Sequence, residues 1–178
     1  MPYRVMLIFV FYCWSMNLCA DEPSLGPVID GYGLTYPIEY RDIALLEDFK
    51  YKVVFDAANY SDDVAALNAR LVSVARFLNM HARNGVPREN MRLAVVLHGA
   101  ALKNALNNAA YKARYDTSNP NLELVMALHR AGVEFYVCGQ SMAFGSVEKS
   151  ELASPAKVAL SAMTMLSVLQ SNGYALLP

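Results

Sequence analysis

The chain has 178 residues, of which 55% are apolar and 17% charged, a composition typical of one globular domain rather than of a disordered or fibrous protein. The formal net charge is −1, because 15 Lys and Arg residues are balanced by 16 Asp and Glu residues. This balance gives no broad basic surface, so we expect no nucleic acid as a partner.

The first twenty residues have the pattern of a secretory signal peptide. Arg4 is followed by an apolar run over residues 5–14, which is shorter than the roughly 20 residues of a membrane-spanning helix. We expect cleavage after Ala20, and therefore a periplasmic or secreted protein without membrane attachment. The alternative is a buried N-terminal helix or an uncleaved anchor. Leu18 is larger than the residue common before a lipidated cysteine, so lipidation of Cys19 is not expected.

Residues 21–50 are expected to form an extended N-terminal arm. The segment contains several Pro and Gly residues and has neither a helical nor an alternating apolar period. Its aromatic and apolar content is too high for a solvated tail. We therefore expect the arm to lie on the domain or on a neighbouring subunit.

From residue 51 onward, short apolar runs alternate with helical patterns. Residues 52–57 predict a first strand. An amphipathic helix is predicted to follow over about 62–83, capped by Ser61 or Asp62, with Asn79 among the residues on its polar side.

A second strand is predicted at 92–97, and its lack of polar alternation is typical of a strand buried on both faces. A helix is expected over residues 100–111. The next helix is predicted to start at Asn119-Pro120 and to end at Gly132, followed by a third strand over residues 133–138.

The last third of the chain predicts a loop or short helix over residues 140–154 and then a long helix that starts at Ser154-Pro155 and ends at Gly173. Residues 174–177 predict a fourth parallel strand. Strands that alternate with helices are typical of an α/β domain with a mostly parallel sheet, here over residues 51–178. The buried side of the last helix is assigned to Val158, Ala162, Met165, Leu166 and Leu169.

Two reactive side chains are predicted at the carboxyl ends of strands, where ligands gather in open parallel sheets. Cys138 is the last residue of the third strand, and His98 follows the second. A helical turn that begins near Gln140 and Ser141 would direct amide groups at the sulfur, which favours thiolate. Gly139 lets another group approach the backbone closely.

Each of these two residues has a plainer interpretation. Cys13 and Cys19 lie in the predicted leader, so Cys138 would be the single cysteine of the exported protein and could form no internal disulfide. It is either a small core residue, a link between chains or a reactive thiol. For His98 the alternative is a hydrogen-bonded turn residue.

Other site classes receive little support. The cysteine and the three histidines, His81, His98 and His129, show no ligand spacing for zinc, so no metal is expected. The end of the first strand carries Asp56-Ala57-Ala58-Asn59 rather than a glycine-rich phosphate loop, so no nucleotide cofactor is expected. Ser141 lacks the Gly-x-Ser-x-Gly frame of a serine nucleophile. Glu148 and Glu151 are interpreted as solvated.

Residues 95–102, 133–141 and the tail segments 159–164 and 169–176 resemble the DsrE/DsrF-like family of sulfur-relay proteins. The resemblance covers about residues 51–177. It implies a flavodoxin-like, three-layer α/β/α subunit that assembles into trimers or hexamers. It also implies that Cys138 accepts a persulfide and passes it to a partner thiol, with no cofactor required.

The resulting hypothesis is an exported sulfur carrier in which Cys138 holds sulfane sulfur and His98 is a neighbour that tunes the thiolate. Gly99, Gly139, Gln140 and Ser141 are expected to form the binding surface around the sulfur. A protein thiol is the expected sulfur donor or acceptor. The alternative is a non-catalytic oligomeric binding or assembly module in which Cys138 is structural and the arm bridges subunits. The familiar relay proteins are cytoplasmic, so an exported member would need other partners.

Overall fold

A computed structural model of the chain describes residues 22–38, 40–46, 48–58 and 63–177, so the predicted leader and the predicted helix caps Ser61 and Asp62 lie outside the described residues. The described part contains one five-stranded sheet in which every neighbouring pair of strands is parallel, with the order β4-β3-β2-β1-β5. The strands are β1 (Tyr51–Ala57), β2 (Met91–Leu97), β3 (Glu134–Cys138), β4 (Ala156–Ala159) and β5 (Ala175–Leu177).

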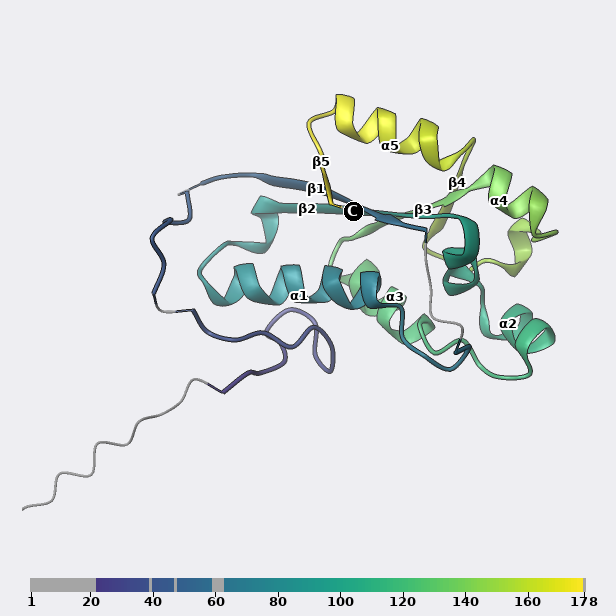
Figure 1. Cartoon of the computed structure of the whole chain (residues 1–178), viewed down its shortest axis with the longest axis horizontal. Helices are drawn as coiled ribbons and strands as arrows, with labels where there is room; N and C mark the ends of the chain where they lie inside the picture. The colour runs from purple at the N-terminus through teal and green to yellow at the C-terminus, as the bar shows by residue number, and fades with distance from the viewer. Residues whose placement is uncertain (1–21, 39, 47, 59–62, 178) are drawn as a thin grey trace, which may run out of the picture.

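Helices cover both faces of this sheet, which confirms the predicted three-layer α/β/α fold (Figure 1). Helices α1 and α3 lie on one face and α5 lies on the other. The helices are α1 (Ala69–Arg83), α2 (Asn108–Tyr115), α3 (Leu122–Arg130), α4 (Gly139–Phe144) and α5 (Ala162–Ser171), with 3-10 turns η1 (Arg88–Asn90), η2 (Gly99–Ala105) and η3 (Lys149–Glu151).

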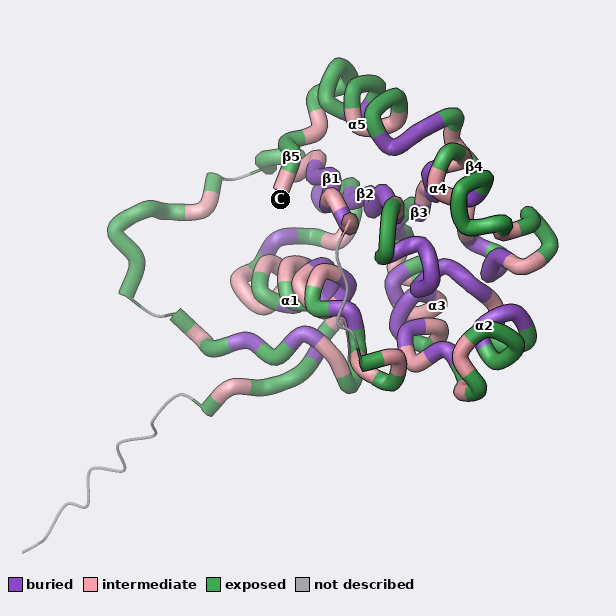
Figure 2. Tube along the Cα trace, turned by 45° about the vertical axis from the view of Figure 1, so that its right-hand side comes forward, coloured by how far each residue is buried: buried purple, intermediate pink, exposed green. Residues whose placement is uncertain are grey.

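The two faces of the sheet bury unequal cores. Val53 and Phe55 point into the large cluster beneath α1 and α3, whereas Val54 and Val96 point into a smaller cluster under α5 that also holds Cys138. This division follows from the two-residue alternation of strand side chains. Figure 2 shows the strands largely buried and the outer side of α5 exposed. Cys138 therefore lies on the more thinly covered side of the sheet.

The first long helix starts later than predicted. Its N-cap is Asn68, whose side chain accepts hydrogen bonds from the N–H groups of Arg70 and Leu71. Residues 64–66 form a turn instead, and the Asp63 carboxylate accepts the N–H of Ala65. Asparagine is as good a cap as the residues favoured from the sequence, so the local chemistry allowed several starting points.

The prediction of one helix over residues 100–111 is also wrong. A 3-10 segment over Gly99–Ala105 comes first, Leu106 is extended, and α2 begins only after Asn107. The Asn107 side chain accepts the N–H of Ala110 and so caps the new helix. Asn104, which is buried, donates to Ala101 O within the 3-10 segment. Asparagine side chains that bond locally to the backbone compete with a continuous helix in this way.

The helix predicted to start at Ser154-Pro155 is replaced by an edge strand and a shorter helix. Residues 156–159 pair with β3 as β4, with Lys157 and Val158 exposed. Helix α5 begins after Ser161, whose hydroxyl accepts the N–H of Thr164. The sheet consequently has five strands rather than four, and Val158 belongs to a strand rather than to the buried side of a helix.

The N-terminal arm is held on α1 of its own chain. Ser24 and Thr35 pair through two backbone hydrogen bonds and so close a loop. Asn79 is completely buried, although the sequence pattern placed it on the polar side of α1. Its Oδ1 accepts the N–H groups of Val28 and Ile29. Its Nδ2 donates to carbonyl groups of the same loop, those of Ile29, Tyr32 and Gly33.

Gly33 makes this close approach to α1 possible. A side-chain carbon at this position would lie 2.4 Å from the backbone nitrogen of Arg76, and the residue has a φ of +69°. Farther along the arm, Tyr36, Tyr40 and Ile43 are exposed. The part of the arm near Asn79 is thus integral to the domain. Within the described residues, no helix has both the length and the apolar character required to cross a membrane.

Candidate functional site

The carboxyl ends of β1, β2 and β3 bring three reactive side chains to one edge of the sheet. Asp56 is the second-last residue of β1, His98 follows β2 directly and Cys138 ends β3. Strand alternation places Asp56 on the same face as Val54, and Cys138 on the same face as Val96. Parallel strands end at a common edge, so the structure brings together the two residues that the sequence singled out and adds Asp56 to them.

The Cys138 sulfur lies in a shell of hydrogen-bond donors. Cys138 is the N-cap of α4, and its Sγ accepts the N–H of Ser141 at 3.4 Å. The Ser141 hydroxyl and the N–H groups of Gln140 and Ala162 also act on this sulfur and lower its pKa. The donors come from the first turns of α4 and α5, where helical N–H groups have no partners within their own helix. The shell thus joins two elements that are distant in sequence.

Two opposing effects set the pKa of Cys138. Only 5% of the residue is exposed, and this burial by itself would raise the pKa of the thiol. The hydrogen bonds from Ser141, Ala162 and Gln140 favour the charged form and outweigh the burial, so the pKa of Cys138 lies below its ordinary value. The sulfur is therefore both packed and activated toward thiolate, which combines two of the three interpretations that the sequence left open, the core residue and the reactive thiol.

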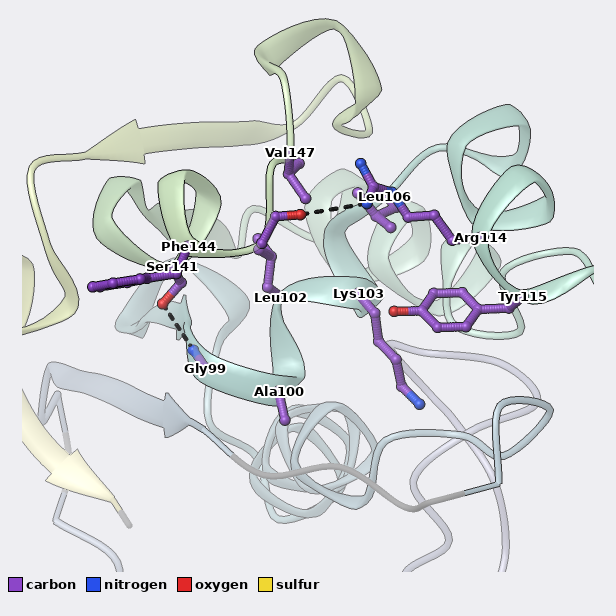
Figure 3. A pocket seen from close by; sticks show the side chains of 11 residues that line it. Gly99, Ala100, Leu102, Lys103, Leu106, Arg114, Tyr115, Ser141, Phe144 and Val147 are labelled. Atoms are coloured by element: carbon purple, nitrogen blue, oxygen red, sulfur yellow. Dashed lines mark hydrogen bonds between the residues drawn. The ribbon is translucent and has the colours of Figure 1, made fainter.

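Ser141 connects Cys138 to the end of β2. Its Oγ accepts the N–H of Gly99 at 2.9 Å (Figure 3). Its own N–H donates to the sulfur, and its hydroxyl lowers the pKa of Cys138. Gly99 has a φ of +52°, a conformation that favours glycine. Because an oxygen that accepts one hydrogen bond presents its own proton elsewhere, the Gly99 contact helps to direct the Ser141 hydroxyl toward Cys138.

Replacing Ser141 with alanine should raise the pKa of Cys138, because one donor to the thiolate is lost. Since only the thiolate is alkylated, the rate of iodoacetamide alkylation rises with pH through this pKa. We expect the midpoint of that profile to move to higher pH and the rate at pH 7 to fall about tenfold, the effect of losing one hydrogen bond to a charged group. The plateau at high pH should be unchanged.

Stopped-flow alkylation over a pH series measures this profile. Ser167→Ala removes an exposed serine hydroxyl from α5 and should leave the profile unchanged. If the midpoint of Ser141→Ala coincided with that of the unmodified protein, the Ser141 hydroxyl would not stabilise the thiolate.

Gly139 and Gln140 contribute to the site through their backbone. A side-chain carbon on Gly139 would lie 2.8 Å from Ala159 O and 3.3 Å from Leu160 O, so glycine lets α4 start directly against the end of β4. The side chain of Gln140 is exposed, and its N–H is the group directed at the sulfur. The glycines and Ser141 predicted from the sequence thus lie together around Cys138.

His98 and Asp56 form a hydrogen-bonded pair beside this shell. The distance between His98 Nε2 and Asp56 Oδ1 is 2.6 Å. The backbone N–H of His98 donates to Ala57 O, which extends the pairing of β1 and β2 by one residue. Sequence reasoning missed Asp56 as a site residue. The signal that could have found it is its two-residue spacing from Val54 near the end of a predicted strand.

Ser141 also lines a pocket of about 400 Å³, of which Cys138 is not a lining residue. Ser141 and Gly99 line one end of it, and Arg114 and Tyr115 line the other (Figure 3). Arg114 forms an ion pair with Glu151 at 2.8 Å, and the N–H of Glu148 and the Arg114 side chain hold the pKa of Glu151 below its ordinary value. Glu151 therefore holds Arg114, which lines this pocket, while its own side chain stays partly exposed.

The other histidines do not approach Cys138. His81 stacks on Phe77 with ring centroids 3.9 Å apart, and burial lowers the pKa of His81. His129 is exposed in the last turn of α3. Across the described ranges, no three His, Cys, Asp or Glu side chains lie together in a way that could hold a metal ion.

Comparisons with known proteins agree on the fold. The sequence model of the DsrE/DsrF-like family matches residues 50–178. The solved structure of a protein of unknown function from Methanobacterium thermoautotrophicum is similar to this chain, with a TM-score of 0.54 and 17% sequence identity over 71% of this chain and 97% of that one. Among curated proteins, no match was found.

Proposed function

The chain belongs to the DsrE/DsrF-like family, and from this premise we propose that Cys138 accepts sulfane sulfur as a persulfide and passes it to a partner thiol. Membership of the family indicates a sulfur-relay role in general. The observation that carries the specific proposal is the shell of donors from Ser141, Gln140 and Ala162 around the Cys138 sulfur.

The chemistry of sulfur transfer explains why this shell matters. The thiolate is the nucleophile in exchange at sulfur. When Cys138 attacks the outer sulfur of a donor persulfide, a new S–S bond forms at Sγ, the donor S–S bond breaks and its electron pair leaves with the donor thiolate. The sulfane sulfur keeps its oxidation level, so no oxidant or reductant is needed. Donors that stabilise an anionic sulfur favour the attacking thiolate.

The absence of a second cysteine after Cys19 supports a carrier rather than a redox switch. A neighbouring thiol could attack the inner sulfur of the persulfide, which would form a disulfide with Cys138 and expel the outer sulfur as sulfide. After residues 1–20 the chain offers no such thiol, so a sulfur on Cys138 would stay until a thiol from another molecule takes it.

The Cys138→Ser variant tests this proposal. After incubation with polysulfide and removal of excess reagent, cyanide converts protein-bound sulfane sulfur to thiocyanate, which is measured by its absorbance with ferric iron. We expect about one equivalent from the unmodified protein and none from Cys138→Ser. Both proteins should keep the same circular dichroism spectrum and oligomer mass. Equal thiocyanate yields would contradict the proposal.

A second candidate function is a non-catalytic binding or assembly module. The 5% exposure of Cys138 and its packing with Ala162 and Leu169 favour a structural role for the sulfur. The two functions differ in the reactivity of the folded protein. A structural Cys138 should resist alkylation until the protein unfolds, whereas a carrier thiolate should react under native conditions.

We also propose that the protein works outside the cytoplasm as a homo-oligomer, a trimer or a hexamer. The leader pattern of residues 1–20 supports export. Large apolar side chains are exposed on β4, on α5 and on the turn between them, those of Val158, Met163 and Leu160, and they support contacts between subunits. The sulfur donor or acceptor would then be a protein thiol in the same exported compartment.

A further inference from the structure

The Asp56 carboxylate and the His98 imidazole lie side by side at the edge of the sheet where β3 ends in Cys138. His98 Nε2 and Asp56 Oδ1 are 2.6 Å apart, with 26% and 31% of the two side chains exposed. A carboxylate oxygen accepts, so Nε2 carries a proton and donates it to Asp56. The other ring nitrogen, Nδ1, is then the one that can exchange a proton with a bound molecule. Partial exposure allows a reactant to reach the pair.

The strand register sets this pair beside Cys138. The backbone of His98 is extended, with φ −151° and ψ 176°, so the alternation of β2 continues through it. Val96 is paired with Tyr136, and two residues farther along each strand His98 falls level with Cys138. The two side chains therefore leave the same face of adjacent strands, which are spaced about 4.8 Å apart.

We propose that His98 is the acid that protonates the departing thiolate of the sulfur donor and that Asp56 is its positioning residue. This inference rests on the proposed function. Ionisation of Cys138 first releases its thiol proton, which His98 takes up on Nδ1. In the loading step the thiolate attacks the outer sulfur of R–S–SH, an S–S bond forms at Sγ, the donor S–S bond breaks, and the R–S⁻ that leaves takes the proton from Nδ1. The net reaction converts the Cys138 thiol and R–S–SH into the Cys138 persulfide and R–SH.

The geometry favours the departing sulfur over Sγ as the target of His98. An S–S bond is about 2.0 Å long, so in an in-line transfer the attacking and departing sulfurs are roughly 4 Å apart or more. A side chain on the neighbouring strand spans this separation. Sγ, in contrast, already receives hydrogen bonds from Ser141, Gln140 and Ala162. In unloading, the same imidazole would take the proton of the acceptor thiol, because the reverse reaction passes through the same groups.

Two small reagents that differ in their leaving group test this role. Methyl methanethiosulfonate releases a sulfinate, which departs without a proton, whereas hydroxyethyl disulfide releases an alkyl thiolate, which benefits from one. Both modify Cys138, and intact-mass spectrometry gives the rate of each. His98→Gln should slow the reaction with the disulfide about a hundredfold, the lower range for a positioned general acid, and should leave the reaction with the thiosulfonate unchanged. Asp56→Asn should slow the disulfide reaction alone, by a smaller factor.

His129→Gln is the matched control, since it removes an exposed histidine from α3 and should alter neither rate. An equal decrease with both reagents in His98→Gln would show that His98 only supports the local structure, and an unchanged disulfide rate would show that it supplies no proton. Either result would overturn this inference and leave the carrier function intact. If the thiosulfonate did not label the unmodified protein, the thiolate would be inaccessible, and the proposed function would fail together with the inference.

Discussion

Gly139→Ala should destabilise the protein and deactivate Cys138 at the same time. The added carbon would lie 2.8 Å from Ala159 O, and the atom it meets is backbone rather than the end of a flexible side chain. The end of β4 must therefore shift away from α4. Overpacking of this kind costs about 1–3 kcal/mol of unfolding free energy. Because Ala162 follows this segment and donates to Sγ, the shift should weaken the donor shell and raise the pKa of Cys138.

Urea unfolding and the pH profile of alkylation measure the two effects. Gln140→Ala is the matched control, because it changes the adjacent exposed side chain and keeps the N–H that donates to the sulfur. We expect the control to leave both measurements unchanged. A Gly139→Ala protein with unaltered stability and alkylation profile would refute the tight contact between α4 and the end of β4.

Asn79→Leu should release the N-terminal arm. Leucine fills a similar volume but has no polar atoms. It can neither accept hydrogen bonds from the N–H groups of Val28 and Ile29 nor donate to the carbonyl groups that accept from Asn79 Nδ2. Each buried backbone group left without a partner costs about 1–3 kcal/mol, which favours an arm that detaches into water. We expect a loss of roughly 3 kcal/mol in unfolding free energy, because the buried contacts of Ile29 are lost as well.

Limited proteolysis measures this release directly. In Asn79→Leu, cleavage within residues 22–38 should become much faster while the remainder of the domain resists. Gln170→Leu, an exposed amide on α5 changed in the same way, should keep the arm protected. If the arm stayed protected in Asn79→Leu, the hydrogen bonds of Asn79 would not be what holds it in place.

Strands buried on both faces were predictable because their signal is local. β2 contains an unbroken apolar run from Leu93 to Leu97, and the predicted bounds of β1 and β3 differ from the observed ones by one residue. β4 was not predictable by the same means. It is a four-residue edge strand, and Val158 lies four residues before Ala162, so the pair fits the period of a helix. Only pairing with β3 identifies these residues as a strand.

The site was predictable as far as it depends on strand ends. Cys138 ends one apolar strand and His98 follows another, and Gly139, Gln140 and Ser141 come directly after Cys138 in sequence. The proximity of these three residues to Cys138 is therefore a local property. The donation from Ala162 to Sγ is not local, since it depends on how α5 returns over the sheet. The burial of Asn79 is likewise set by the arm, because its position in α1 fits the exposed side of an amphipathic helix.

The intact mass of the protein, purified without reductant, tests the central claim most directly. It is measured before and after incubation with polysulfide, and again after Cys138 has been alkylated. We predict that polysulfide adds the mass of one or more sulfur atoms to the folded protein and that prior alkylation of Cys138 prevents any addition. A thiol that stays unmodified in the folded protein, or sulfur that is added equally after alkylation, would contradict a carrier role for Cys138.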